Sequence, residues 1–393
     1  MRKITEDAFY GLNKINYKEI FETIKVLHNK SLFRYDGVNM LYETDKLEEE
    51  LKKYFNQEVL CVNNGTSALK LCLLANNIGY GDEVIVPCLS FIATASSCLS
   101  VGAVPIFCEI DETFTIDPHD IEQKITKKTK AIVAVHYQGY SCNMDKIKQI
   151  AKKYKLILIE DVAQAFGAQY NNKLLGTFGD SAAFSFQSCK IITCGEGGAI
   201  TSKKNMDFIK RYVDNGGHRE KDMMPVWDKK NCTYGENFKM TDLQSAILIN
   251  QFKKIKKIIK NQEKIYETII KNIKGYNLRK CLNEKYSIKM SLCVIFNNQK
   301  ECDIFIKEML KYNIPFSKKT ANFLPDYNVF KYGKTFSKNN FPFNDKYKVN
   351  SCKKSRHLIE RTAWLVLNSK NKKSDCKYIS KIMRKFKDEQ FYL

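Results

Sequence analysis

The chain has 393 residues, of which 44% are hydrophobic and 12% aromatic, and its formal net charge is +22. This composition excludes disordered and fibrous proteins, and no apolar run approaches the roughly 20 residues that a membrane helix needs. Only eight of the 65 basic residues are arginine, whereas base-edge readout of DNA favours arginine forks. We therefore interpret the lysines as residues of solvent-exposed surfaces, whose positive field favours anionic substrates.

The N-terminal segment has a basic start but no apolar stretch behind it. This pattern predicts no secretory signal and a cytoplasmic location. The fourteen cysteines are spread along the chain and include no Cys-x-x-Cys pair. We therefore expect most of them to be reduced and to serve as small apolar fillers.

From about residue 45 the sequence alternates helix-like and strand-like segments. The expected helices are 45–55, 67–76, 92–100 and 144–154, and the expected strands are 59–62, 83–86, 104–107, 131–135 and 156–159, with 120–125 continuing the alternation. This βαβ rhythm predicts an α/β fold with a mainly parallel sheet and helices on both faces.

The second part of the chain has a different pattern. A long helical segment is expected over 241–273, followed by a strand at 291–296, a helix at 302–312, a polar stretch with few periodic signals and a helix near 375–386. Because a single hydrophobic core usually stops growing at about 250–300 residues, we expect two domains. We place the boundary near residue 255, with a large domain of 1–255 and a smaller α+β domain of 256–393.

Two strand ends carry residues suited to a phosphorylated aromatic cofactor. Gly65, Thr66 and Ser67 follow an expected strand and open a helix, where free N–H groups and the helix dipole bind phosphate. Thr or Ser is also an ordinary helix N-cap, so this turn alone is weak evidence. Phe91 follows the next expected strand and can stack on a heteroaromatic ring or simply fill the core.

A third strand end carries an acid. Asp161 follows the apolar run 156–159, at the edge where open α/β sheets place their ligands. Its carboxylate can pair with a protonated pyridine nitrogen, although an isolated Asp there is more often a turn or cap residue. Gln164 can pack near the ring or hold its phenolic oxygen, or be an ordinary surface amide.

Lys190 stands between an expected strand and a Gly-Glu-Gly-Gly turn at 195–198. Strand alternation puts Ser185 and Gln187 on one face, away from Phe184 and Phe186, so the two polar side chains are expected to face the cofactor. Lys190 is then a candidate Schiff-base lysine that moves a proton at the substrate carbon, even though any one of 57 lysines is more often solvent-exposed.

The joint occurrence in this order of a phosphate turn, a strand-end acid and a lysine before a Gly-rich turn indicates a pyridoxal phosphate (PLP) site. These segments resemble the PLP-dependent sugar aminotransferases of the DegT/DnrJ/EryC1/StrS group. The resemblance runs from about residue 33 to 248 and is carried by 65–69, 86–95, 160–167 and 184–198.

The resemblance implies fold type I, the aspartate-aminotransferase-like fold, and a set of residue roles. Lys190 is the implied Schiff-base lysine and Asp161 the pyridinium partner, while Gln164 and Phe91 flank the ring. Thr66, Ser67 and Ser185, with Gly65, are the implied phosphate ligands.

The segment 235–241 resembles one that, in this family, reaches the phosphate of the neighbouring subunit. Asn237 is thus implied as a ligand in trans, and a homodimer is expected. Lys239 departs from the usual arginine of this segment, and an ammonium cannot form a bidentate fork.

The implied activity is transfer of an amino group from glutamate or glutamine to a keto-sugar, with a nucleotide-linked sugar favoured, in amino-sugar biosynthesis for a surface polysaccharide or a secondary metabolite. A keto-cyclitol acceptor stays open. A sugar dehydratase of this family would have histidine in place of Lys190, and a regulatory homologue without turnover is disfavoured by the joint presence of Lys190, Asp161 and Ser185.

Overall fold

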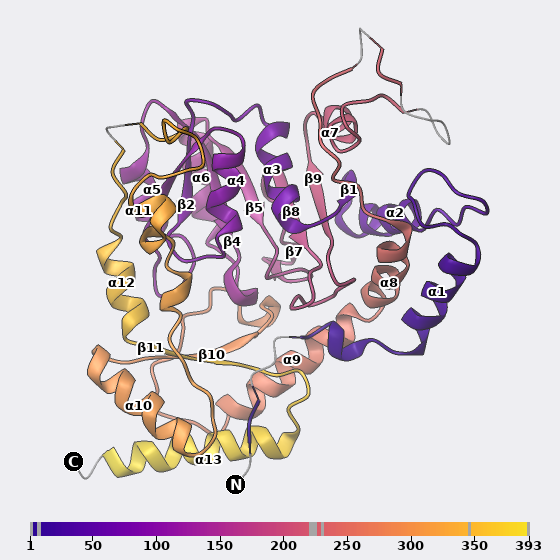
Figure 1. The fold of residues 1–393 in the computed structure, drawn as a ribbon. Helices are drawn as coiled ribbons and strands as arrows, with labels where there is room; N and C mark the ends of the chain where they lie inside the picture. Colours follow the sequence, from indigo (N-terminus) through magenta and orange to yellow (C-terminus); the bar gives the residue numbers. More distant parts are fainter. Residues whose placement is uncertain (1–2, 6–8, 220–225, 229–231, 345–346, 391–393) are drawn as a thin grey trace.

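A seven-stranded sheet with the order β1-β9-β8-β5-β4-β2-β3 organises the chain (Figure 1). The computed structural model describes residues 3–5, 9–219, 226–228, 232–344 and 347–390. The strands of this sheet are β1 (Val59–Val62), β2 (Glu83–Pro87), β3 (Val104–Cys108), β4 (Thr129–Val135), β5 (Ile157–Asp161), β8 (Ser181–Ser185) and β9 (Gly198–Ser202).

The strand directions place six strand ends at one edge. β8, β5, β4, β2 and β3 are mutually parallel, and β9 is antiparallel to both β8 and β1. β1 therefore runs in the same direction as the parallel strands. The prediction of a mainly parallel sheet is confirmed, and the carboxyl ends of β1, β8, β5, β4, β2 and β3 lie at a common edge.

Helices cover both faces of this sheet (Figure 1). Those of the N-terminal part are α1 (Tyr17–His28), α2 (Glu43–Phe55), α3 (Gly65–Ala75), α4 (Ala93–Ser100), α5 (Pro118–Lys124), α6 (Met144–Tyr154), α7 (Met206–Tyr212) and α8 (Asp242–Phe252). The two-residue strands β6 (Gln169–Tyr170) and β7 (Lys173–Leu174) form a separate hairpin.

Alternation along each strand sorts the core into two layers, because successive side chains point to opposite faces. Val84 and Val86 belong to one cluster with residues of α3, α4 and α7. Ile85, Ile132 and Leu158 belong to the other, with residues of α2, α5, α6 and α8. The central strands are thus buried on both faces, which explains their continuous apolar runs.

The C-terminal part is built around a two-stranded antiparallel sheet. Its elements are α9 (Ile255–Ile270), β10 (Ser291–Ile295), α10 (Gln299–Lys311), α11 (Asn328–Lys331), α12 (Lys353–Glu360), β11 (Thr362–Val366) and α13 (Lys373–Gln390). Leu292, Phe305, Leu365 and Ile379 belong to its own hydrophobic cluster. Among the described residues, no helix is both long and apolar enough to cross a bilayer.

Three sequence expectations differ from the structure. The helix expected over 241–273 is two helices that change direction at Lys253 and Lys254, where Lys254 donates to the Lys14 carbonyl at 2.9 Å and pairs with Glu19 of α1. The polar stretch between 312 and 375, for which few periodic signals were found, contains helix α12 and strand β11. β8 ends at Ser185, so Gln187 lies beyond the strand on which it was expected.

Candidate active site

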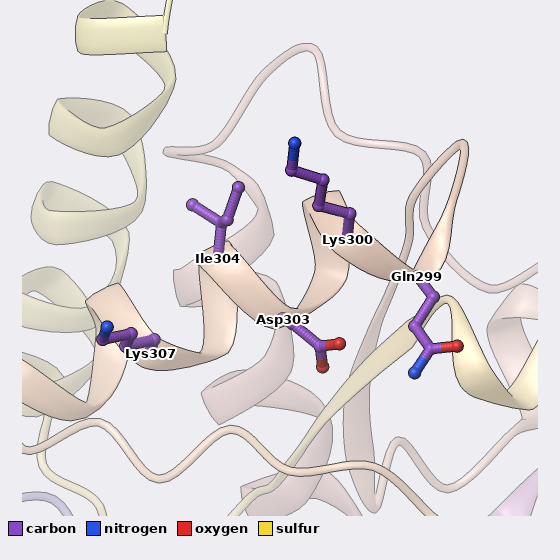
Figure 2. Close-up of a pocket in the computed structure, with 5 residues that line it drawn as sticks. All are labelled: Gln299, Lys300, Asp303, Ile304 and Lys307. Carbon is purple, nitrogen blue, oxygen red and sulfur yellow. The ribbon is translucent and has the colours of Figure 1, made fainter.

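A cavity of about 930 Å³ opens at the edge where the parallel strands end. It brings together nine of the ten site residues expected from the sequence, which are Gly65, Thr66, Ser67, Phe91, Asp161, Gln164, Ser185, Gln187 and Lys190. A smaller hollow of about 490 Å³ lies on the surface of α10, and all five residues that line it come from that one helix (Figure 2). The candidate chemistry is therefore concentrated in the larger cavity.

The acid at the end of β5 is buried and held by two donors. Asp161 is 4% exposed; its Oδ2 accepts from Thr94 Oγ1 at 2.9 Å, and its Oδ1 accepts from the Ala163 amide at 3.1 Å. Burial raises the pKa of this carboxyl above its usual value, although the two donors and the Lys190 ammonium act in the opposite direction. A cation bound in the cavity would therefore stabilise the ionised form.

Lys190 lies on the connection between β8 and β9, and this connection is fixed by hydrogen bonds. Its amide donates to the Gln187 carbonyl at 2.9 Å, and its own carbonyl accepts from the Gly11 amide at 3.2 Å. Gln187 Oε1 accepts from the Cys189 amide at 3.0 Å. The turn presents the half-buried Lys190 to the cavity that contains Asp161.

The start of α3 offers unused donors to the same cavity. Its N-cap is Asn64, whose Oδ1 accepts from the Ser67 amide at 2.8 Å, so neither Thr66 nor Ser67 acts as the cap. Among the described residues, none accepts a hydrogen bond from the Gly65 or Thr66 amide. Free amides in the first turn of a helix form an anion site.

Close packing joins this turn to the end of β8. A Cβ atom on Gly65 would lie 2.7 Å from Ser185 Cβ and 3.1 Å from Ser185 Oγ. Only glycine allows this approach without a shift of the backbone. The Ser185 hydroxyl is thereby held beside the free amides of α3.

Two further side chains, those of Phe91 and Gln164, line the cavity. Phe91 is 58% exposed although it follows a buried strand, which leaves its ring open to a ligand. The Gln164 Oε1 accepts from the Gln138 amide at 3.1 Å. The amide nitrogen of Gln164 is then the group that remains to donate to a ligand.

Behind the cavity, a buried histidine and glutamate connect β4 and β5. His136 Nε2 lies 3.1 Å from Glu160 Oε2, while Nδ1 accepts from the Cys142 amide at 3.1 Å. The Glu160 carboxylate also accepts from the amides of Gly176, Phe178 and Gly179. Burial alone would raise the pKa of Glu160, but His136 and the amides of Gly176 and Gly179 hold it below its usual value. The pair fixes the strand ends and does not line the cavity.

Asn237 is the expected site residue that lies outside the cavity. It is exposed, and its backbone pairs with Asp214. Lys239 Nζ donates to Asp214 Oδ1 at 2.6 Å, and Arg219 Nε donates to Asp214 Oδ2 at 2.8 Å. Burial would raise the pKa of Asp214, but the two cations hold it below its usual value. Lys239 thus already has a carboxylate partner within its own chain.

The sequence did not identify several residues of the cavity. Thr94 has a sequence signal, because it lies in the first turn of α4 just after Ser90 and Phe91, and its hydroxyl contacts both Asp161 and Ser90. Lys319 and Asn322 come from the polar stretch, and Met290 lies beside β10. These C-terminal residues reach the cavity only through long-range packing.

Comparison with known proteins places the chain among aminotransferases. Residues 18–384 match the DegT/DnrJ/EryC1/StrS aminotransferase family. An uncharacterised protein of Methanocaldococcus jannaschii is 35% identical, over 84% of this chain and 87% of that protein.

Two characterised relatives match over shorter spans. GDP-perosamine synthase of Escherichia coli O157:H7 is 42% identical over 55% of this chain and 59% of its own length. L-glutamine:2-deoxy-scyllo-inosose aminotransferase of Streptomyces lividus is 37% identical over 48% of this chain and 46% of its own length. The chain thus spans roughly half of these two proteins.

The fold has a close counterpart among solved structures. An aminotransferase of Psychrobacter cryohalolentis superposes with a TM-score of 0.83 and 28% identity, covering 96% of this chain and 98% of that one. The similarity extends through both parts of the chain, including the C-terminal part that the motifs do not cover.

Proposed function

The chain belongs to the DegT/DnrJ/EryC1/StrS aminotransferase family, and we propose that it uses PLP to move an amino group from glutamate or glutamine to a keto-sugar, with the nucleotide-linked form preferred. Aminotransferases of this family depend on PLP. The main support for the proposal is that Lys190, Asp161 and the free amides of α3 line the same cavity.

The residues present fit this cofactor. Asp161 is a buried carboxyl group whose pKa is raised by burial. A nearby cation would stabilise its ionised form, and a pyridinium nitrogen is such a cation. The α3 amides, Thr66, Ser67 and Ser185 would hold the phosphate, and the exposed Phe91 ring would stack on the pyridine. Gln164 would donate its amide N–H to the phenolic oxygen.

When bound, PLP supplies an electron sink for the substrate carbon that loses its proton. The chain's own task is to hold and move that proton. The Lys190 amine, once freed by the incoming amino group, would take the proton from the substrate Cα and deliver it to C4′ of the cofactor. Asp161 would keep a proton on the pyridine nitrogen, which requires the carboxylate to stay ionised.

The acceptor is inferred from the relatives and from the charge of the chain. GDP-perosamine synthase forms, by its name, a GDP-linked amino sugar, and the net charge of +22 favours an anionic acceptor. The second candidate is a keto-cyclitol, which the 2-deoxy-scyllo-inosose aminotransferase favours. Because that relative uses glutamine, by its name, glutamine stays in the proposal as an amino donor beside glutamate.

A homodimer with shared active sites completes the proposal. One face of α1, at the periphery beside α8 (Figure 1), is apolar and open to solvent in the single chain. Its residues, each more than half exposed, are Tyr17, Ile20, Phe21, Ile24 and Leu27. Contiguous exposed apolar side chains of this kind mark an interface. The exposed Asn237, outside its own cavity, would then reach the phosphate of the partner.

The dimer and the role of Asn237 can be tested together by complementation. Lys190→Ala and Asn237→Ala subunits would each be impaired as homodimers. Co-expressed, they would form mixed dimers in which one site combines a native Lys190 with a native Asn237 from the partner, so activity should exceed that of either parent. Activity no higher than that of the parents would show that Asn237 acts within its own chain. Ile24→Glu should yield monomers in sedimentation, whereas Tyr80→Glu, at a still more exposed site away from α1, should not.

We also propose that the chain divides into domains near residue 255, at the start of α9. The separate hydrophobic cluster of the C-terminal part supports this division. Limited proteolysis followed by mass spectrometry tests it, with the first stable fragments expected to end near that residue.

The activity itself is tested in two steps. Purified protein should bind PLP, and borohydride reduction should fix the cofactor covalently to the peptide that contains Lys190. The Lys190→Ala protein should show no such mass shift. A screen of nucleotide-linked keto-sugars, free keto-sugars and keto-cyclitols with glutamate or glutamine would then identify the acceptor. Protein that neither retains nor takes up PLP would contradict the proposal.

A further inference from the structure

A loop of the C-terminal part forms one wall of the cavity and is fastened at both ends. At one end, Ser317 and Trp364 of β11 exchange two backbone hydrogen bonds of 2.9 and 2.8 Å. At the other end, the Leu324 amide donates to the Cys88 carbonyl at 2.8 Å, and the Ser90 amide donates to the Asn322 carbonyl at 3.2 Å. The loop is therefore held between the small sheet and the segment that leads to Phe91.

Two polar side chains of this loop line the cavity and have no hydrogen-bond or ion-pair partner among the described residues. Lys319 is half-buried and lines the cavity together with Asn322. Within the described part of the chain, no carboxylate lies within ion-pair distance of Lys319, and the Asn322 side chain makes no hydrogen bond. An ammonium in this position lacks the counter-charge that a partly buried cation usually has.

The neighbouring lysine shows the contrast. Lys318 forms an ion pair with Asp303 of α10, a residue on the helix surface drawn in Figure 2. The Lys318 side chain does not line the cavity. The other cavity lysine of the α3 region, Lys70, is paired with Glu236 at 2.9 Å. Among the lysines that line the cavity, Lys319 is thus the cation that has neither an acid partner nor the expected covalent role of Lys190.

We propose that Lys319, assisted by the Asn322 amide, binds an anionic group of the substrate. Two sources fit this chemistry under the proposed function, on which the inference rests: the carboxylate of the amino donor and the diphosphate of a nucleotide-linked acceptor. A lysine is a point charge that accepts either group. The fixed loop limits the loss of backbone entropy when the anion binds.

The test measures binding and needs no turnover. Glutarate serves as the probe for the donor carboxylates and GDP and dTDP as probes for the diphosphate, each titrated calorimetrically into PLP-loaded protein. Lys319→Gln should weaken binding of one class of probe by about 10- to 100-fold, the range for a hydrogen bond to a charged group. Lys319→Arg, which keeps the charge, should restore most of the affinity.

Lys318→Gln is the matched control, since it removes the same charge one residue away. It should bind every probe as the unmodified protein does, and thermal melting should confirm that all variants are folded. A loss confined to glutarate assigns Lys319 to the amino donor, and a loss confined to the nucleotides assigns it to the acceptor.

Equal binding by Lys319→Gln and Lys318→Gln, or no binding of any probe by the unmodified protein, would overturn the inference. Failure of the proposed function is distinguishable: no keto-sugar would be aminated, while binding of a probe would still depend on Lys319.

Discussion

Replacement of Asp161 by asparagine would separate the charge of this side chain from its hydrogen bonds. Asparagine has the same shape, and its Oδ1 can accept from the Ala163 amide as the carboxylate does at 3.1 Å. Its Nδ2 can donate to Thr94 Oγ1, because the Thr94 hydroxyl can turn and donate to Ser90 Oγ, 2.8 Å away. We therefore expect Asp161→Asn to fold with its local network intact.

Activity and stability should change in opposite directions. Removing one partner of a buried ion pair costs about 3–5 kcal/mol, so loss of the pyridinium partner should slow amino transfer by roughly 10²- to 10⁴-fold. In the cofactor-free protein, however, burial raises the pKa of Asp161. A carboxyl whose folded pKa exceeds its unfolded value lowers stability as the pH rises through that interval. The asparagine variant should then be at least as stable as the unmodified protein at neutral pH.

The assay pairs single-turnover kinetics with thermal melts of cofactor-free protein. Any stability advantage of Asp161→Asn at pH 7 should disappear below about pH 4, the unfolded pKa of an aspartate, where both proteins are neutral at this position. Retention of more than a tenth of the native rate would refute the ion-pair role. A clear loss of stability at neutral pH would refute the account of the hydrogen-bond network.

Three further substitutions test the structure around the site. Gly65→Ala would place a Cβ atom 2.7 Å from Ser185 Cβ, so calorimetry should show a loss of about 1–3 kcal/mol from overpacking together with weaker PLP binding; Gly79→Ala, whose Cβ would meet its nearest neighbour at 3.5 Å, should show neither. Phe91→Ala should leave the free energy of unfolding within about 0.5 kcal/mol, as expected of an exposed residue, yet weaken PLP binding by about 2- to 10-fold through lost stacking. Lys239→Met should lower stability in urea by about 1–3 kcal/mol, because the buried Asp214 loses a charged donor; an unchanged midpoint would show that Arg219 alone satisfies this carboxylate.

The parts of the fold that sequence could predict are those fixed by local pattern. β1 and α6 begin and end at the residues expected, since each is a short run with a clear period between turn residues. β11 was missed, because its pairing with β10 joins residues such as Ser291 and Val366 that are far apart in the chain. The break between α8 and α9 was missed because helical periodicity continues through it.

The same distinction applies to the candidate site. Residues at strand ends, such as Asp161, were identifiable because a parallel sheet brings its strand ends to one edge. Thr94 was overlooked although its position on α4 puts it beside the acid. Lys319 had no local signal, since only the packing of the C-terminal loop on Cys88 and Ser90 brings it to the cavity.

The segment from Cys88 to Thr94 joins two parts of the site by different kinds of contact. Its hydrogen bonds to the loop of Lys319 use backbone groups, the Cys88 carbonyl and the Ser90 amide. It meets Asp161 through side chains, the hydroxyls of Ser90 and Thr94. Backbone contacts persist whatever side chains the loop carries, so residues 319 and 322 can be exchanged without disturbing the hydrogen bonds of the acid. The geometry therefore permits the proposed substrate wall to change while the groups proposed to hold the cofactor stay the same.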